Sequence, residues 1–115
     1  MALAHAIPGE VVRIAPLGTQ IPATRTSALL KSQQLEVVRV VLAQGQHMRE
    51  HRAPGEITLL CIEGQVRIAL GSDGERVMTT GDFLHLPAHA PHALEAEQDC
   101  SLLVTMCLLP GTQPG

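Results

Sequence analysis

Short apolar runs, separated by polar turns that contain glycine or proline, make up most of the chain. Residues Gln65 to Leu70 alternate polar and apolar side chains, as a strand with one buried face does. The run Leu35 to Ala43 is almost continuously apolar, and its paired valines favour a strand over a helix because β-branched side chains lose rotamer freedom in a helix. This run is therefore expected to be covered on both faces.

The same pattern predicts strands along the whole chain and no convincing helix. A first strand ends at Pro16 and a second precedes the Gln33-Gln34 pair, while the tetrapeptide 71–74 forms a tight reversal. Regularly spaced short strands are typical of a β-sandwich or β-barrel. The predicted strands are 10–14, 27–31, 35–43, the run before Ala53, 57–62, 65–70, 75–79, 83–86, 92–97 and 100–109.

Composition limits the function classes. The 115 residues are enough for one domain, 1–115, and with a single Phe and no Trp or Tyr its core must be aliphatic. A net charge of −3 without a basic block argues against binding of nucleic acid. No apolar run reaches the ~20 residues that a membrane-spanning helix needs. The N-terminus lacks the charged region of a signal peptide and the three cysteines form no C-x-x-C pair, so we expect a cytoplasmic protein. Residues 1–9 and 110–115 are expected to be flexible.

Five of the six histidines fall in two similar stretches, 45–64 and 81–96. Each stretch begins with glycine and contains a short apolar strand, a proline-containing corner and histidine. These stretches resemble the paired motifs of the cupin superfamily, and the resemblance covers about residues 35–109. In the first motif, G-x5-H-x-H-x3-E-x6-G, the matching residues are Gly45, His51 and Gly64; in the second, G-x5-P-x-G-x2-H-x3-N, they are Gly81, Pro87 and His92.

The resemblance implies an all-β, antiparallel cupin barrel (a double-stranded β-helix, or jelly roll), but part of the family's metal chemistry is missing. Ala53 and Ile57 stand where the family has a second histidine and a glutamate, and Ala96 stands where it has asparagine. His89 replaces the family's second glycine. Of the family's metal ligands, three histidines and a glutamate, only His51 and His92 carry over.

A metal site therefore needs a third ligand. His47 lies four residues before His51, an even spacing that places both side chains on one face of a regular strand, and His85 is the other candidate. Glu56 lies one residue before the family's carboxylate position, so only a bulge would turn it inward. With His51, His92 and His47, the site would hold a divalent transition metal such as Zn, Ni, Mn or Fe; the alternative is that the histidines are remnants.

Three residues are assigned to contact with a small-molecule ligand, namely Arg49, Cys61 and His85. Three functions stay open: a small-molecule-binding cupin with or without a metal, a metal-dependent oxygenase or isomerase acting on a small organic acid, and a structural or regulatory dimer with a vestigial pocket. We expect a homodimer, because a strand that is apolar on both faces is usually covered by a partner.

Overall fold

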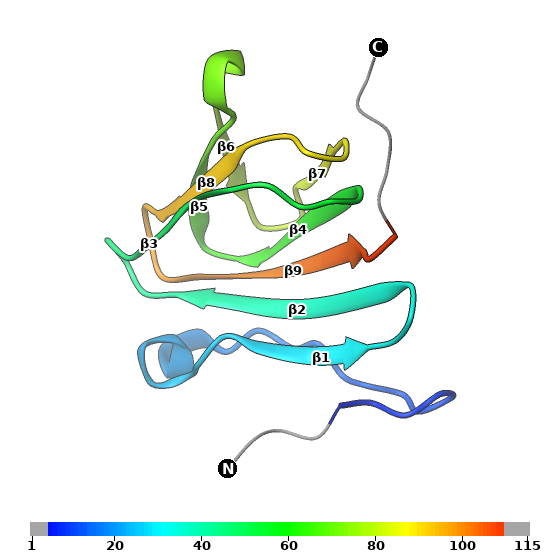
Figure 1. Cartoon of the computed structure of the whole chain (residues 1–115). Coiled ribbons are helices and arrows are strands. Elements are labelled where there is room, and N and C mark those ends of the chain that lie inside the picture. Colours follow the sequence, from blue (N-terminus) through cyan, green and yellow to red (C-terminus); the bar gives the residue numbers. More distant parts are fainter. Residues whose placement is uncertain (1–4, 110–115) are drawn as a thin grey trace.

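The structure, a computed structural model, describes residues 5–109, so the predictions for residues 1–4 and 110–115 lie outside it. Two antiparallel sheets face each other, in the strand orders β1-β2-β9-β4-β7 and β3-β8-β5-β6 (Figure 1). The strands are β1 (Ser27–Lys31), β2 (Leu35–Leu42), β3 (His47–His51), β4 (Ile57–Glu63), β5 (Gln65–Ala69), β6 (Glu75–Thr79), β7 (Phe83–Leu86), β8 (His92–Ala96) and β9 (Cys100–Cys107). The predicted all-β antiparallel barrel is confirmed.

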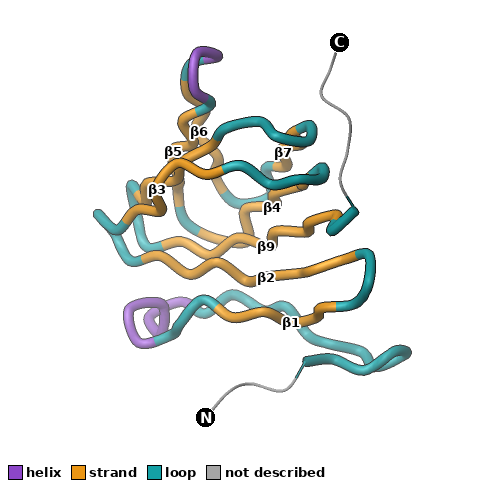
Figure 2. The backbone as a smooth tube through the Cα atoms, viewed as in Figure 1, coloured by secondary structure: helices purple, strands orange, loops and turns teal. Residues whose placement is uncertain are grey.

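Helix is limited to two short 3-10 turns among the described residues, η1 (Gly18–Ala23) and η2 (Gly71–Asp73) (Figure 2). None of these described helices is long and apolar enough to cross a membrane. The predicted strand at 10–14 is wrong: these residues are irregular and mostly exposed. They lie in a segment that is held to the barrel by a few specific contacts and not by strand pairing.

The core lies between the two sheets and is almost wholly aliphatic. Alternate residues of β9 and β2 point inward, so Leu102 and Val104 pack against Val40 and Leu42. From the other sheet, β5 contributes Val66 and Ile68, both fully buried. The polar–apolar alternation predicted for residues 65–70 therefore places the apolar side chains of β5 in the core.

The outer face of β2 is covered by the N-terminal part of the same chain. The Arg39 side chain donates to the Ala15 carbonyl, and Val41, which points to the same outer face, is only 6% exposed. Figure 1 shows the blue N-terminal segment running alongside β1, outside the barrel. The apolar character of β2 on both faces is thus explained within one chain, and it no longer argues for a dimer through this strand.

Tight corners depend on the three glycines of the sequence motifs. Gly45, Gly64 and Gly81 all have a left-handed backbone, with φ of 86°, 84° and 89°. At Gly64, between β4 and β5, an added Cβ would also lie 2.0 Å from the Asp99 carbonyl oxygen. No other residue fits there without moving the backbone.

Candidate ligand cavity

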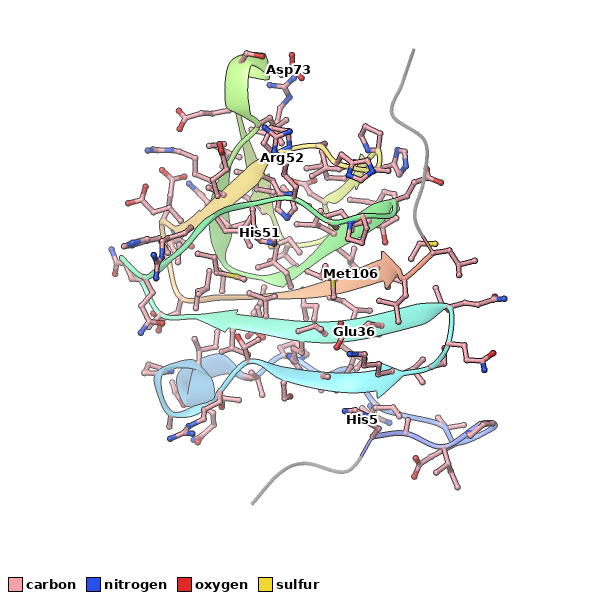
Figure 3. The ribbon with its side chains drawn as sticks, viewed as in Figure 1. His5, Glu36, His51, Arg52, Asp73 and Met106 are labelled. Carbon is pink, nitrogen blue, oxygen red and sulfur yellow. The ribbon has the colours of Figure 1, made fainter. Side chains whose placement is uncertain are left out.

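A small apolar cavity of about 180 Å3 lies inside the barrel, between the two sheets. Its polar groups are the imidazoles of His51 and His92 and the Thr26 hydroxyl, and Met48 and Met106 add thioethers. Figure 3 labels His51 and Met106, which come from β3 and β9. The remaining lining is aliphatic: Val38, Val40, Ile57, Leu59, Leu94 and Val104.

A bulge in β3 decides which side chains reach this inner cavity. Met48 pairs with Leu94 and His51 pairs with His92, so two residues of β3 lie opposite the single residue Ala93. This extra residue places Met48 and His51, three positions apart, on the inner face.

His47 consequently faces outward, and the expectation that it shares a face with His51 is wrong. It lines a shallow outer groove of about 290 Å3 on the far side of the same sheet, together with Arg49, Arg67 and Glu95. Arg49, assigned to ligand contact, is therefore also remote from the inner cavity.

The two inner histidines form a pair with a defined hydrogen-bonding pattern. Their ring centroids are 4.1 Å apart and their planes are inclined by 62°. The Nδ1 of His51 is 3.1 Å from the Arg49 carbonyl oxygen, and the Nδ1 of His92 is 3.1 Å from the Ala90 carbonyl oxygen. A carbonyl only accepts, so both Nδ1 atoms carry the hydrogen, and in the neutral form of each ring it is Nε2 that holds the lone pair.

The environment keeps His92 neutral. His92 is 3% exposed, and this burial lowers its pKa from the ordinary value, with the neighbouring His51 adding to the effect. The Ala90 carbonyl and Glu50 act in the opposite direction without reversing it. A neutral ring can accept a hydrogen bond or ligate a metal, whereas a protonated ring can do neither.

His85 does not complete a metal site. On β7 the alternate residues Leu84 and Leu86 pack toward the core, so His85 points outward. Its Nε2 lies 2.7 Å from Oε1 of Glu56, which is exposed as well. The prediction that His85 contacts a ligand in the barrel is therefore wrong, and Glu56 is not turned inward.

Cys61 belongs to the core and does not line the inner cavity. It is 1% exposed, and burial raises the pKa of its thiol, so it is not an activated nucleophile. Its Sγ lies 3.5 Å from the Glu63 carbonyl oxygen, at the β4–β5 corner. The packing interpretation of Cys61 fits these contacts, and the ligand assignment does not.

The remaining donors do not fit a divalent metal site of the family type. Within residues 5–109, no three or more His, Cys, Asp or Glu side chains lie together as a group that could hold a metal ion. Ala53 packs against the core, and Ile57 fills part of the cavity wall where the family has its carboxylate. Two imidazoles are fewer than the three protein ligands that such ions usually take.

Sequence reasoning missed the two methionines of the inner cavity. The inward direction of Met106 could have been predicted from the regular alternation Leu102, Val104, Met106 along the last strand. Met48 was not, because its inward direction depends on the bulge and regular alternation from His51 would turn it outward. Thr26, immediately before β1, was likewise not predicted to line the cavity.

Comparisons with known proteins agree with this fold. The family model described as "Cupin domain" matches residues 38–106. A cupin superfamily protein of Desulfitobacterium hafniense is 23% identical, with a TM-score of 0.75, covering 92% of this chain and 100% of that one. An RmlC-like cupin family protein of Methanocaldococcus jannaschii, with a double-stranded β-helix fold, is 13% identical with a TM-score of 0.69, covering 86% and 93%.

A variant of oxalate decarboxylase from Bacillus subtilis is 22% identical with a TM-score of 0.60, covering 66% of this chain and 22% of that one. At such identities these structures share the fold alone. The comparison with curated proteins finds no match.

Proposed function

This chain belongs to the cupin family, and we propose that it is a small-molecule-binding member that takes a compact, mostly apolar ligand into the inner cavity. The observation that carries the proposal is an aliphatic cavity with two Nε2 lone pairs on neighbouring rings of its wall. Ligand sites are typically apolar with a few well-placed polar groups that fix orientation. At about 180 Å3, the inner cavity is below the usual range of about 300–1,000 Å3, so the ligand is small.

The hydrogen-bonding pattern indicates which polar group the ligand carries. Both Nδ1–H groups are occupied by backbone carbonyls, so the rings offer the ligand acceptors only. A hydroxyl or N–H group satisfies an acceptor, whereas a carboxylate requires a donor. A small phenol or alcohol is therefore preferred over a small organic acid.

The metal-dependent oxygenase or isomerase hypothesis receives less support. It requires a ligand set that His47 and His85, both directed outward, do not supply. The ligand that this hypothesis names, an organic acid, would also need one of the inner rings to be protonated. Burial of His92 opposes that protonation.

Binding of phenol and of benzoate to the untagged full chain tests the proposal. We expect phenol to shift the ring 15N resonances of His51 and His92 in NMR spectra, and His51→Ala to weaken binding by about tenfold, the value of one hydrogen bond of about 1.4 kcal/mol. His47→Ala is the matched control and should bind like wild type. Benzoate binding at least as well as phenol, or equal loss in both variants, would contradict the proposal.

A further inference from the structure

The outer groove, on the far side of the sheet β3-β8-β5-β6, has a floor of alanine between side chains of opposite charge. Ala93 on β8 pairs directly with Ala69 on β5, and both are only partly buried. At one end of this pair the bulge in β3 places Arg49 beside Ala93, and at the other end Glu75 on β6 pairs with Ala69. We call Arg49, Ala93, Ala69 and Glu75 the outer row, and all four line the groove of about 290 Å3.

The two charged ends of the outer row have no partner in the described part of the chain. Neither the guanidinium of Arg49 nor the carboxylate of Glu75 makes an ion pair or a side-chain hydrogen bond there, and both side chains are exposed. The neighbouring row is different, because Arg67 pairs with Glu97 and lies 3.9 Å from Glu95. The groove therefore presents an unpaired cation on β3 and an unpaired anion on β6, with an apolar floor between them.

This charge pattern disfavours a ligand that carries charge of one sign only. An anion drawn to Arg49 would also lie near the carboxylates of Glu75 and Glu95, which line the same groove. A cation drawn to Glu75 would likewise meet the guanidinium groups of Arg49 and Arg67. Like charges brought together are unfavourable, so the complementary ligand carries one charge of each sign, held apart.

We propose that the outer groove binds short peptides with free termini, about three residues long, whose carboxylate contacts Arg49 and whose ammonium contacts Glu75. Three spacings between strands of about 4.7–4.9 Å place the backbones at the two ends of the row about 14 Å apart. An extended tripeptide spans up to about 10 Å, and the two long side chains lean inward over the alanines to meet it. A single α-amino acid carries both charges on one carbon and is too short to contact both ends.

The outer row also offers suitable contact chemistry at each point. Arginine presents a planar fork that matches a carboxylate in bidentate geometry. The methyl groups of Ala69 and Ala93 let a ligand with small side chains lie close to the sheet and bury apolar surface against it. The outer groove and the inner cavity lie on opposite faces of the sheet, so this inference is independent of the proposed function.

The experiment is an NMR titration of the 15N-labelled, untagged full chain with tri-alanine, N-acetyl-tri-alanine and tri-alanine amide. In wild type, tri-alanine should shift the backbone resonances of Ala69 and Ala93. It should bind about fivefold more tightly than either blocked peptide, the upper value for one exposed ion pair. Alanine itself should bind no more tightly than the blocked peptides.

Two variants test which end of the peptide meets which residue. Arg49→Gln should bind tri-alanine about fivefold more weakly and should no longer distinguish tri-alanine from its amide, while it still prefers a free amine. Glu75→Gln should show the opposite pattern. Arg52→Gln is the matched control, because Arg52 is exposed but does not line the groove, and it should behave like wild type.

The proposal is overturned if both blocked peptides bind as tightly as tri-alanine, or if Arg52→Gln loses as much affinity as Arg49→Gln. The outer row is also self-complementary, since Arg49 of one copy can face Glu75 of another across a two-fold axis. Light scattering of wild type and Arg49→Gln separates these cases. Equal masses support the peptide site, whereas a lower mass in Arg49→Gln would show that the row binds a second copy of the chain and would overturn the proposal.

Discussion

The Glu63 carboxylate, at the end of β4, joins the N-terminal segment to the barrel. Its Oε2 accepts the backbone N–H of Leu17 at 2.8 Å and its Oε1 accepts that of Gly18 at 2.9 Å. It also accepts the Ser101 hydroxyl and pairs with Arg39 at 3.2 Å. We call Glu63, Arg39 and Ser101, with residues 15–18, the anchor network. We predict that Glu63→Ala strongly destabilises the protein.

The magnitude follows from burial. The side chains of Arg39 and Glu63 are only 10% and 14% exposed, and Nε of Arg39 already has no hydrogen-bond partner. Removing one member of a buried ion pair leaves an uncompensated charge and typically costs about 3–5 kcal/mol. The same range is expected here. Glu95→Ala is the control: its oxygen is 3.9 Å from Arg67 and its side chain is 56% exposed, so the loss should be under about 1 kcal/mol.

Urea unfolding measures the global effect, and trypsin cleavage after the exposed Arg13 measures release of the N-terminal segment. Glu63→Gln keeps the shape of the side chain and serves if the alanine variant does not fold. We expect cleavage of Glu63→Gln to be faster than that of wild type and of Glu95→Ala. Unchanged unfolding together with unchanged cleavage would show that the anchor network does not hold the segment.

Three further predictions concern pH, metal selectivity and assembly. Burial alone would raise the pKa of Glu63, but the Ser101, Leu17, Gly18 and Arg39 contacts together hold it below the ordinary value of 4.5. The stabilisation is therefore complete above that value and is lost as pH falls through the lower folded value, so thermal melting between about pH 5 and pH 3 should fall more steeply in wild type than in Glu63→Gln. Ala53→His should increase Zn(II) affinity in a competition titration by adding a third imidazole, and an unchanged affinity would show that position 53 does not reach the ion. Finally, we propose a homodimer through Phe83 and Leu60, which pair on the outer sheet face and are 64% and 36% exposed, respectively. Light scattering should give twice the 12.3 kDa mass of one chain for wild type and the mass of one chain for Phe83→Lys.

Much of the fold could be predicted because its signals are local. Alternation along 65–70, the valine-rich run at 35–43 and the glycine corners each depend on residues close in sequence, and all correspond to strands or turns of the structure. The strand predicted at 10–14 failed because its composition permits a strand but no neighbour pairs with it. Pairing is a tertiary property that local composition does not contain.

The motif frame was also informative where the residue had changed. His89 stands at the family's second glycine, and its φ of 66° is the left-handed conformation that glycine tolerates best. The backbone requirement of this corner has thus been kept while the side chain has changed. The motif predicted the course of the backbone more faithfully than it predicted the chemistry of the site.

The chemistry of the inner cavity depends on a single extra residue in β3. If pairing continued regularly from Met48 opposite Leu94, Glu50 would lie opposite His92 and face inward, and His51 would face outward. Because of the bulge, His51 faces inward and Glu50 does not, so the cavity contains an imidazole in place of a carboxylate. Since Ile57 stands where the family has its carboxylate, no acidic side chain lines this cavity. A cavity of this kind favours neutral, weakly polar occupants over hard divalent ions, so the bulge in β3 underlies the proposed function.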